Sequence, residues 1–192
     1  MKVKVGVMGS AGGELSETTR GKARQLGREV ALRDCALVTG ACPGLPHEAV
    51  LGAKELGALV VGISPGLSLS EHISRYHSPY EPYDVLIYTG SGLMGREIEI
   101  VRTCDIVTLI GGRTGTLGEF AIAYDEGKLI GALTGTGGVA DHIATVLSIT
   151  NKDTGAEVVF NDDPAKLMEE LLNRYLQRVA LGIAYLPPRV DG

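Results

Sequence analysis

The chain has 192 residues, a formal net charge of −5 and 21% charged residues, with no run of more than two basic residues. This length predicts one domain that folds around its own core, and the acidic balance argues against a nucleic-acid partner. No apolar stretch approaches the roughly 18 residues of a membrane span, and the first residues do not resemble a signal peptide. We therefore expect a cytoplasmic protein without a membrane association.

Short runs of β-branched residues alternate with helical patterns along the chain. The predicted strands are Lys4–Met8, Ala36–Thr39, Leu59–Ile63, Val85–Tyr88, Ile106–Ile110, Leu129–Leu133 and Glu157–Phe160. The predicted helices are Glu17–Arg33, Pro46–Leu56, Met94–Thr103, Leu117–Glu126, Val139–Ile149 and Pro164–Gln177. Strands separated by helices predict right-handed crossovers, which build a parallel sheet covered on both faces.

This pattern predicts an α/β protein with a three-layer, modified Rossmann fold. We expect a mainly parallel sheet of about seven strands in the order 3-2-1-4-5-6-7, which places a ligand crevice beside the first, fourth and fifth strands. The domain should span residues 1–180, followed by an irregular tail over residues 181–192. Residues 64–83 form a long loop with three tyrosines and two histidines. Such a loop is either a lid over a ligand or a segment anchored to the domain.

The turn after the fifth predicted strand carries the strongest functional signal. Gly111, Gly112 and the following residues separate that strand from a helix. Backbone N–H groups at such a turn have no partner in the helix, and the helix dipole adds positive charge there. The turn therefore predicts a site for an anion, most often a phosphate. Glu119 stands at its rim, where a solvated glutamate without a chemical role is the alternative.

Three further turns of small residues follow the first, second and fourth predicted strands. Because the carboxyl ends of parallel strands share one edge of the sheet, the four turns should converge and favour a nucleotide site. The residues expected to bind the nucleotide or its phosphate are Gly9, Ser10, Gly40, Gly44, Gly92, Gly111, Gly112, Arg113, Thr114, Gly115 and Thr116.

Other motifs are weaker or missing. Gly90, Gly92 and Gly95 match the dinucleotide fingerprint G-x-G-x-x-G, but the following strand does not end in the acidic residue that binds ribose. The sequence has no Walker A motif, which argues against kinase chemistry. The four histidines and three cysteines show no metal-ligand spacing, so we expect no metal, and the cysteines are interpreted as buried, reduced thiols.

Arg96 lies in the first turn of the helix after the fourth strand, where a cation is unfavourable to the helix dipole. Its position suggests an anionic ligand or a carboxylate partner. An ion pair with Glu99 or Glu119, without any chemistry, is the alternative.

The segment from Arg96 to Glu119 resembles the LOG ("Lonely guy") family of Rossmann-like proteins, long mislabelled as lysine decarboxylases. The family motif P-G-G-x-G-T-x-x-E, with an Arg-Lys pair fifteen residues before it, corresponds to residues 111–119 without a gap. The resemblance extends over most of residues 3–150. Three positions depart from the motif: Gly111 replaces the proline, Arg113 a glycine, and Glu97 the lysine that follows the arginine.

The resemblance implies an AMP-like ligand, a homodimer or higher homo-oligomer, and no required cofactor. It also implies cleavage of the N-glycosidic bond of a nucleoside 5′-monophosphate, with Arg96 and Glu119 as the catalytic residues. A related branch, which includes the molybdenum cofactor carrier protein, binds a cofactor without known hydrolysis, and this chain is more similar to that branch. Two functions therefore stay open, a phosphoribohydrolase and a non-catalytic carrier or sensor of a nucleotide-like phosphorylated cofactor. A lysine decarboxylase is not expected, because nothing resembles a pyridoxal-phosphate lysine site.

Overall fold

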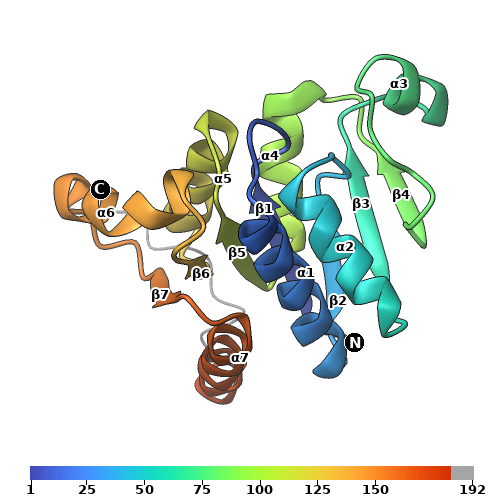
Figure 1. Ribbon diagram of the computed structural model, residues 1–192. Coiled ribbons are helices and arrows are strands. Elements are labelled where there is room, and N and C mark those ends of the chain that lie inside the picture. The colour runs from blue at the N-terminus through green and yellow to red at the C-terminus, as the bar shows by residue number, and fades with distance from the viewer. Residues whose placement is uncertain (183–192) are drawn as a thin grey trace.

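The computed structural model describes residues 1–182 and contains one seven-stranded, all-parallel sheet with helices on both faces (Figure 1). This architecture confirms the predicted α/β, Rossmann-like fold. An irregular tail is expected over residues 181–192. Residues 183–192 of this tail lie outside the described residues. No helix of the described part is both long and apolar enough to cross a membrane.

Apart from α3, which lies in the segment expected to be a loop, the elements agree with the predicted ones to within a few residues at most ends. The strands are β1 (Lys4–Gly9), β2 (Ala36–Thr39), β3 (Val60–Ser64), β4 (Val85–Tyr88), β5 (Ile106–Ile110), β6 (Leu129–Leu133) and β7 (Glu157–Asn161). The helices are α1 (Glu17–Leu32), α2 (Leu45–Glu55), α3 (Leu69–Ser74), α4 (Gly92–Thr103), α5 (Thr114–Asp125), α6 (Ile143–Thr150) and α7 (Pro164–Ala180), with a 3-10 helix η1 (Gly138–His142). The helix predicted over Val139–Ile149 is thus divided between η1 and α6.

The strand order is β4-β3-β2-β1-β5-β6-β7, so the predicted order is wrong in the position of β4. This strand pairs with β3 at the edge of the sheet, and β5 takes the place beside β1. Burial explains the difference, because all five residues of β5 are buried, whereas Val85, Ile87 and Tyr88 of β4 are exposed. The order therefore reverses between β1 and β5, and α4 connects the edge strand β4 with the central strand β5.

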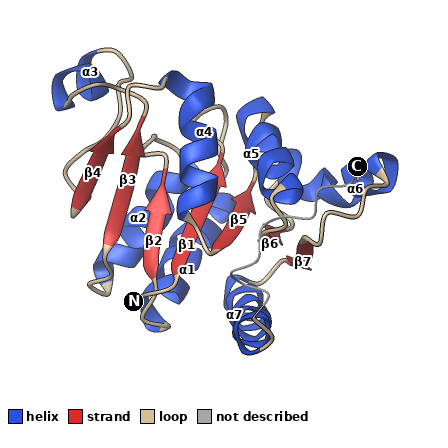
Figure 2. Ribbon diagram, turned by 180° about the vertical axis from the view of Figure 1, so that it is seen from behind, coloured by secondary structure: helices blue, strands red, loops and turns tan. Residues whose placement is uncertain are grey.

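The helices form two layers, and each layer has its own half of the core. Helices α1, α2 and α7 pack on one face, where Leu26, Val50 and Leu167 are fully buried. Helices α4 and α5 cover the other face with η1 and α6 (Figure 2). Ile100 and Phe120 are buried beneath them.

The loop over residues 64–83 is anchored to the domain by buried polar contacts. It contains the short helix α3, whose His72 is fully buried. His72 Nε2 lies 3.0 Å from the carbonyl oxygen of Pro79, and its Nδ1 lies 2.8 Å from Ser64 Oγ. Because a carbonyl oxygen can only accept, Nε2 is the donor in the first contact. Tyr83 is held by a 3.1 Å hydrogen bond between its hydroxyl and Thr39 Oγ1, so the contacts favour the anchored segment over the lid.

Helices α1, α3 and α7 begin at conventional side-chain caps, and α5 does not. Ser16 Oγ accepts from the N–H of Thr19 in α1, and Asp163 Oδ1 accepts from the N–H of Ala165 in α7. Such caps satisfy amides that have no partner inside the helix. The cap residue of α5 is Arg113, whose side chain makes no capping hydrogen bond.

Helices α1 and α2 approach each other closely through two glycines. A Cβ atom added to Gly27 would lie 1.9 Å from the carbonyl oxygen of Ala49, and one added to Gly52 would lie 1.9 Å from that of Arg24. Gly21 lies in the same helix as Gly27, but nothing approaches its Cβ position within 4 Å.

We expect Gly27→Ala to lower the free energy of unfolding by about 1–3 kcal/mol or more, because the new methyl group must push the two helices apart. Gly21→Ala is the matched control and should raise it by about 0.5–1 kcal/mol, because alanine is the better helix former. Chemical denaturation of both variants measures the two effects. Equal changes in the two variants would contradict the close packing.

Candidate functional site

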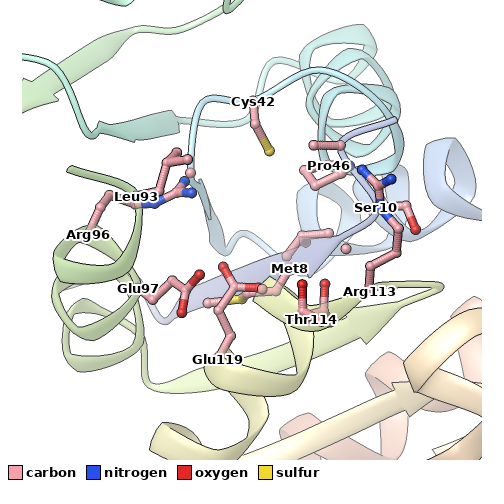
Figure 3. Close-up of a pocket in the computed structure, with 16 residues that line it drawn as sticks. Met8, Ser10, Cys42, Pro46, Leu93, Arg96, Glu97, Arg113, Thr114 and Glu119 are labelled. Atoms are coloured by element: carbon pink, nitrogen blue, oxygen red, sulfur yellow. The ribbon is translucent and has the colours of Figure 1, made fainter. Parts of the chain in front are cut away.

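A cavity of about 460 Å³ opens at the carboxyl ends of β1 and β5, between the turns that follow β1 and β2 and the first turns of α4 and α5 (Figure 3). It therefore lies where the strand order reverses, the usual place for ligands in open α/β sheets. Its lining residues are Val7, Met8, Gly9, Ser10, Ala11, Gly40, Cys42, Pro46, Leu93, Arg96, Glu97, Arg113, Thr114, Gly115, Thr116 and Glu119.

Most of the sequence-predicted site residues meet in this cavity. Those that line it are Gly9, Ser10, Gly40, Arg96, Arg113, Thr114, Gly115, Thr116 and Glu119. The lining does not include Gly44, Gly92, Gly111 and Gly112.

Local backbone contacts account for three of these other glycines, namely Gly111, Gly112 and Gly44. The N–H of Gly111 donates to Thr136 Oγ1 at 2.9 Å, and the N–H of Gly112 donates to Ser10 Oγ at 2.8 Å. Both amides are therefore occupied by side chains and do not point at the cavity as open donors. Gly44 has a φ of 81°, and a Cβ atom there would lie 2.2 Å from the carbonyl oxygen of Ser10, so it permits a close backbone approach.

The open donors lie one turn later, at the amino end of α5. The first hydrogen bond of this helix runs from the N–H of Leu117 to the carbonyl oxygen of Arg113. Within residues 1–182, the N–H groups of Thr114, Gly115 and Thr116 have no hydrogen-bond acceptor. Uncapped amides and the positive end of the helix dipole are favourable for an anion. The exposed side chain of Arg113 adds a positive charge on this side of the cavity (Figure 3).

Arg96 reaches the cavity from α4 and is 7% exposed. Its Nε and Nη1 atoms are buried and have no hydrogen-bond partner in the described part of the chain. Gly40 makes room for the guanidinium, since a Cβ atom there would lie 1.3 Å from Nη1. The ion pairs considered from the sequence are not formed within these residues, and Glu99 instead accepts a 2.7 Å hydrogen bond from Ser91 Oγ. Unsatisfied buried donors of this kind are costly, so they indicate a place for a ligand acceptor.

Two carboxyl groups point into the cavity beside Arg96, one from α5 and one from α4 (Figure 3). Burial raises the pKa of Glu119 to about 8, with Glu97 adding to the rise and the positive charge of Arg96 opposing it. Burial also raises the pKa of Glu97, again against the effect of Arg96. At neutral pH the carboxyl group of Glu119 is therefore mostly protonated.

Sequence reasoning missed several lining residues. Cys42 was interpreted as a buried thiol, but it lines the cavity, where burial raises the pKa of its thiol. Its place in the turn after β2 was the available signal, because that turn was expected at the site. Met8 and Leu93 gave no such signal, since an apolar residue on a strand or helix fits the core equally well. No group of three His, Cys, Asp or Glu side chains suited to a metal ion occurs among residues 1–182.

These features define an α/β protein of the Rossmann-like class with a ligand cavity at its topological switch point. The chain belongs to the SLOG cluster4 family, whose model matches residues 2–168. The match confirms the resemblance to LOG-like proteins that the motif around Glu119 indicates.

Three relatives illustrate this membership. An uncharacterized protein of Archaeoglobus fulgidus is 32% identical over 131 residues, which cover 68% of this chain and 80% of the relative. The crystal structure of TM1055, a structural genomics target, has a TM-score of 0.77 and 28% identity over 91% of this chain and 99% of its own. The molybdenum cofactor carrier protein of Chlamydomonas reinhardtii has a TM-score of 0.70 and 26% identity over 92% of this chain and 99% of its own.

The buried carboxyl group of Glu119 predicts a pH-dependent stability. The pKa is raised from 4.5 to about 8 on folding, so the folded state holds a proton that the unfolded state releases. The stability of the wild-type protein should therefore fall as the pH rises from about 4.5 to about 8, and then level off. Glu119→Gln has no carboxyl proton to lose, so its stability should not fall with pH in this way. Its melting temperature at pH 8 should therefore exceed that of the wild type by several degrees.

Thermal unfolding of both proteins between pH 5 and pH 9 measures this difference, which should shrink toward the acidic end. Glu169→Gln removes an exposed carboxylate on α7 and is the control. Parallel profiles of the wild type and Glu119→Gln would contradict the protonated state of Glu119.

Proposed function

We propose that the protein binds a phosphorylated, nucleotide-like small molecule and carries or senses it without changing it. One observation supports this most directly. The uncapped amino end of α5 faces the same cavity as Arg96, whose buried Nε and Nη1 atoms have no hydrogen-bond partner within residues 1–182. The structural similarity to a molybdenum cofactor carrier protein favours the same class of function.

The phosphate would lie at the amino end of α5. There the amides of Thr114, Gly115 and Thr116 can donate to its oxygens. Backbone amides bind phosphate in this way at the amino ends of helices in other proteins. Arg113 adds a flexible cation that can pair with two of these oxygens. Ser10 Oγ accepts a hydrogen bond from the N–H of Gly112 and so stabilises the turn after β5. The amides of α5 stay available to the ligand.

The protonated state of Glu119 disfavours a hydrolase in which this residue is the charged carboxylate. Cleavage of an N-glycosidic bond builds positive charge on the ribose, and an ionised carboxylate stabilises that charge. The pKa of Glu119 is about 8, so most of the population lacks this negative charge at neutral pH. The lysine of the LOG motif is replaced by Glu97, which brings a second carboxyl group to the same place.

Binding of AMP to the full-length protein by isothermal titration calorimetry tests the phosphate site. We expect Arg113→Ala to weaken binding roughly tenfold or more, because a charge-assisted hydrogen bond to phosphate is lost. Arg75→Ala removes the same charge from the exposed residue that follows α3 and should bind like the wild type.

Native mass spectrometry of the purified protein completes the test. A carrier should release its bound molecule chemically unchanged. Failure to bind any phosphate monoester would overturn the proposal, and steady conversion of the bound molecule would overturn the carrier function.

A second candidate function is hydrolysis of a nucleoside 5′-monophosphate to a free base and ribose 5-phosphate. The observation that favours it is the pair of carboxyl groups from Glu97 and Glu119 in one cavity. Glycosidases use such a pair, in which one group is a protonated general acid and the other activates water or stabilises charge. Glu119 has the raised pKa that a general acid needs.

If this candidate is correct, the wild type should release ribose 5-phosphate from at least one nucleoside 5′-monophosphate. Glu119→Gln should then lose at least roughly a hundredfold in rate while binding the same nucleotide, because the proton donor is lost. A coupled assay for ribose 5-phosphate across adenine, guanine, cytosine and uracil nucleotides measures this. No release from any of them would exclude the hydrolase.

A homodimer or higher homo-oligomer stays a prediction from the LOG-like resemblance. The edge strand β4 exposes apolar residues, since Val85 and Ile87 are both 45% exposed. Exposed apolar strand edges are commonly covered by another chain.

A further inference from the structure

We propose that Asp141 is a positioning residue of the phosphate site, although its exposed side chain does not line the cavity. It acts through two glycine-rich segments, one after β6 and one after β5. The inference rests on the proposed function, because it concerns the phosphate that the amino end of α5 would bind.

The turn after β5 consists of two glycines in the left-handed region, with φ of 59° for Gly111 and 102° for Gly112. Glycine has the widest choice of backbone conformations, so contacts from outside the turn must define its shape. All four backbone polar groups of these two residues have a partner. The N–H of Gly112 donates to Ser10 Oγ, and the other three groups bond to the segment after β6.

The segment after β6 thus makes three hydrogen bonds to this turn. Thr136 Oγ1 accepts from the N–H of Gly111 at 2.9 Å. The N–H of Val139 donates to the carbonyl oxygen of Gly112 at 3.0 Å, and the N–H of Ala140 donates to that of Gly111 at 2.8 Å. The turn after β5, and with it the start of α5, is therefore placed by the segment after β6.

Asp141 in turn defines the conformation of that segment. Gly135, Gly137 and Gly138 all have positive φ, so the segment has as little conformational preference of its own as the turn it contacts. Asp141 Oδ1 accepts from the N–H of Gly135 at 2.7 Å, and its Oδ2 accepts from the N–H of Gly137 at 2.8 Å. Oδ1 also accepts a longer bond, of 3.4 Å, from the N–H of Thr136. An ionised carboxylate accepts several hydrogen bonds at once, and such charge-assisted bonds are stronger than neutral ones.

The alternative is a purely structural role, in which Asp141 only stabilises the short helix η1. The two roles differ in the sign of one effect. Loss of a negative charge favours an anionic ligand, so a residue without a positioning role should give equal or tighter phosphate binding when it is neutralised. A positioning residue should give weaker binding, because the ligand must then order the glycines itself.

Isothermal titration calorimetry of the full-length protein with AMP and with inorganic phosphate tests the inference. We expect Asp141→Asn to bind both ligands roughly tenfold more weakly than the wild type, because the amide nitrogen cannot accept the hydrogen bond that a carboxylate oxygen accepts. The two ligands should lose affinity by the same factor, since both would bind the amides of α5. Asp141→Ala removes all three bonds and should lose more.

Asp162→Asn is the matched control, because it removes the same charge beside the same segment. Asp162 is exposed, and its Cβ atom lies 4.0 Å from the place of a Cβ atom added to Gly135. Within residues 1–182 it accepts no hydrogen bond from this segment, whose amides bond to Asp141 instead. Asp162→Asn should therefore bind both ligands at least as tightly as the wild type.

Amide hydrogen exchange in the ligand-free protein gives an independent measurement. The N–H groups of Gly111 and Gly112 should exchange roughly tenfold faster in Asp141→Asn than in Asp162→Asn, because their hydrogen bonds open more often. Thr136→Ser keeps the hydroxyl that accepts from Gly111 and should bind phosphate like the wild type. Thr136→Val removes that hydroxyl and should weaken binding roughly tenfold.

The outcomes separate the inference from the proposed function. Equal or tighter binding by Asp141→Asn, in a protein whose wild type binds phosphate, would overturn the positioning role and leave the proposed function intact. Unchanged exchange at Gly111 and Gly112 would also overturn it. Failure of the wild type to bind both AMP and inorganic phosphate would overturn the proposed function and the inference together.

Discussion

The buried guanidinium of Arg96 is the constraint on which the cavity depends. It lies against the backbone of Gly40, and two of its nitrogen atoms lack hydrogen-bond partners in the described part of the chain. Its positive charge opposes the pKa rise of both nearby carboxyl groups, so it keeps Glu97 and Glu119 more acidic than burial alone would make them. A cation in this position is unfavourable to the dipole of α4, and the two acidic side chains compensate part of that cost.

Much of the fold could be predicted from local patterns, because each strand overlaps a short apolar run in the sequence. The buried run Ile106–Ile110 and the cap at Asp163 are examples in which sequence and structure agree. The position of β4 at the edge of the sheet could not be predicted from such patterns. Its sequence is as apolar as that of a central strand, and only the three-dimensional arrangement shows that Val85, Ile87 and Tyr88 stay exposed.

The sequence indicated which turns surround the candidate site. It did not indicate which backbone amides and side-chain atoms of those turns are open to a ligand. The motif around Gly111 indicated the edge of the sheet at which the cavity lies, because strand-to-helix turns of a parallel sheet meet at one edge. Which amides remain open depends on side chains distant in sequence, such as Ser10 and Thr136, which occupy the N–H groups of Gly112 and Gly111. The raised pKa of Glu119 likewise depends on burial, which the sequence does not specify.

The contact between Gly40 and Arg96 restricts substitution at position 40. A Cβ atom at position 40 would lie 1.3 Å from a nitrogen of the guanidinium, so no other amino acid at this position is compatible with the present arginine rotamer. A side chain at position 40 therefore requires the arginine to adopt another rotamer or to be replaced. The position of the guanidinium in the cavity is thus coupled to the glycine, although the two residues lie far apart in the chain.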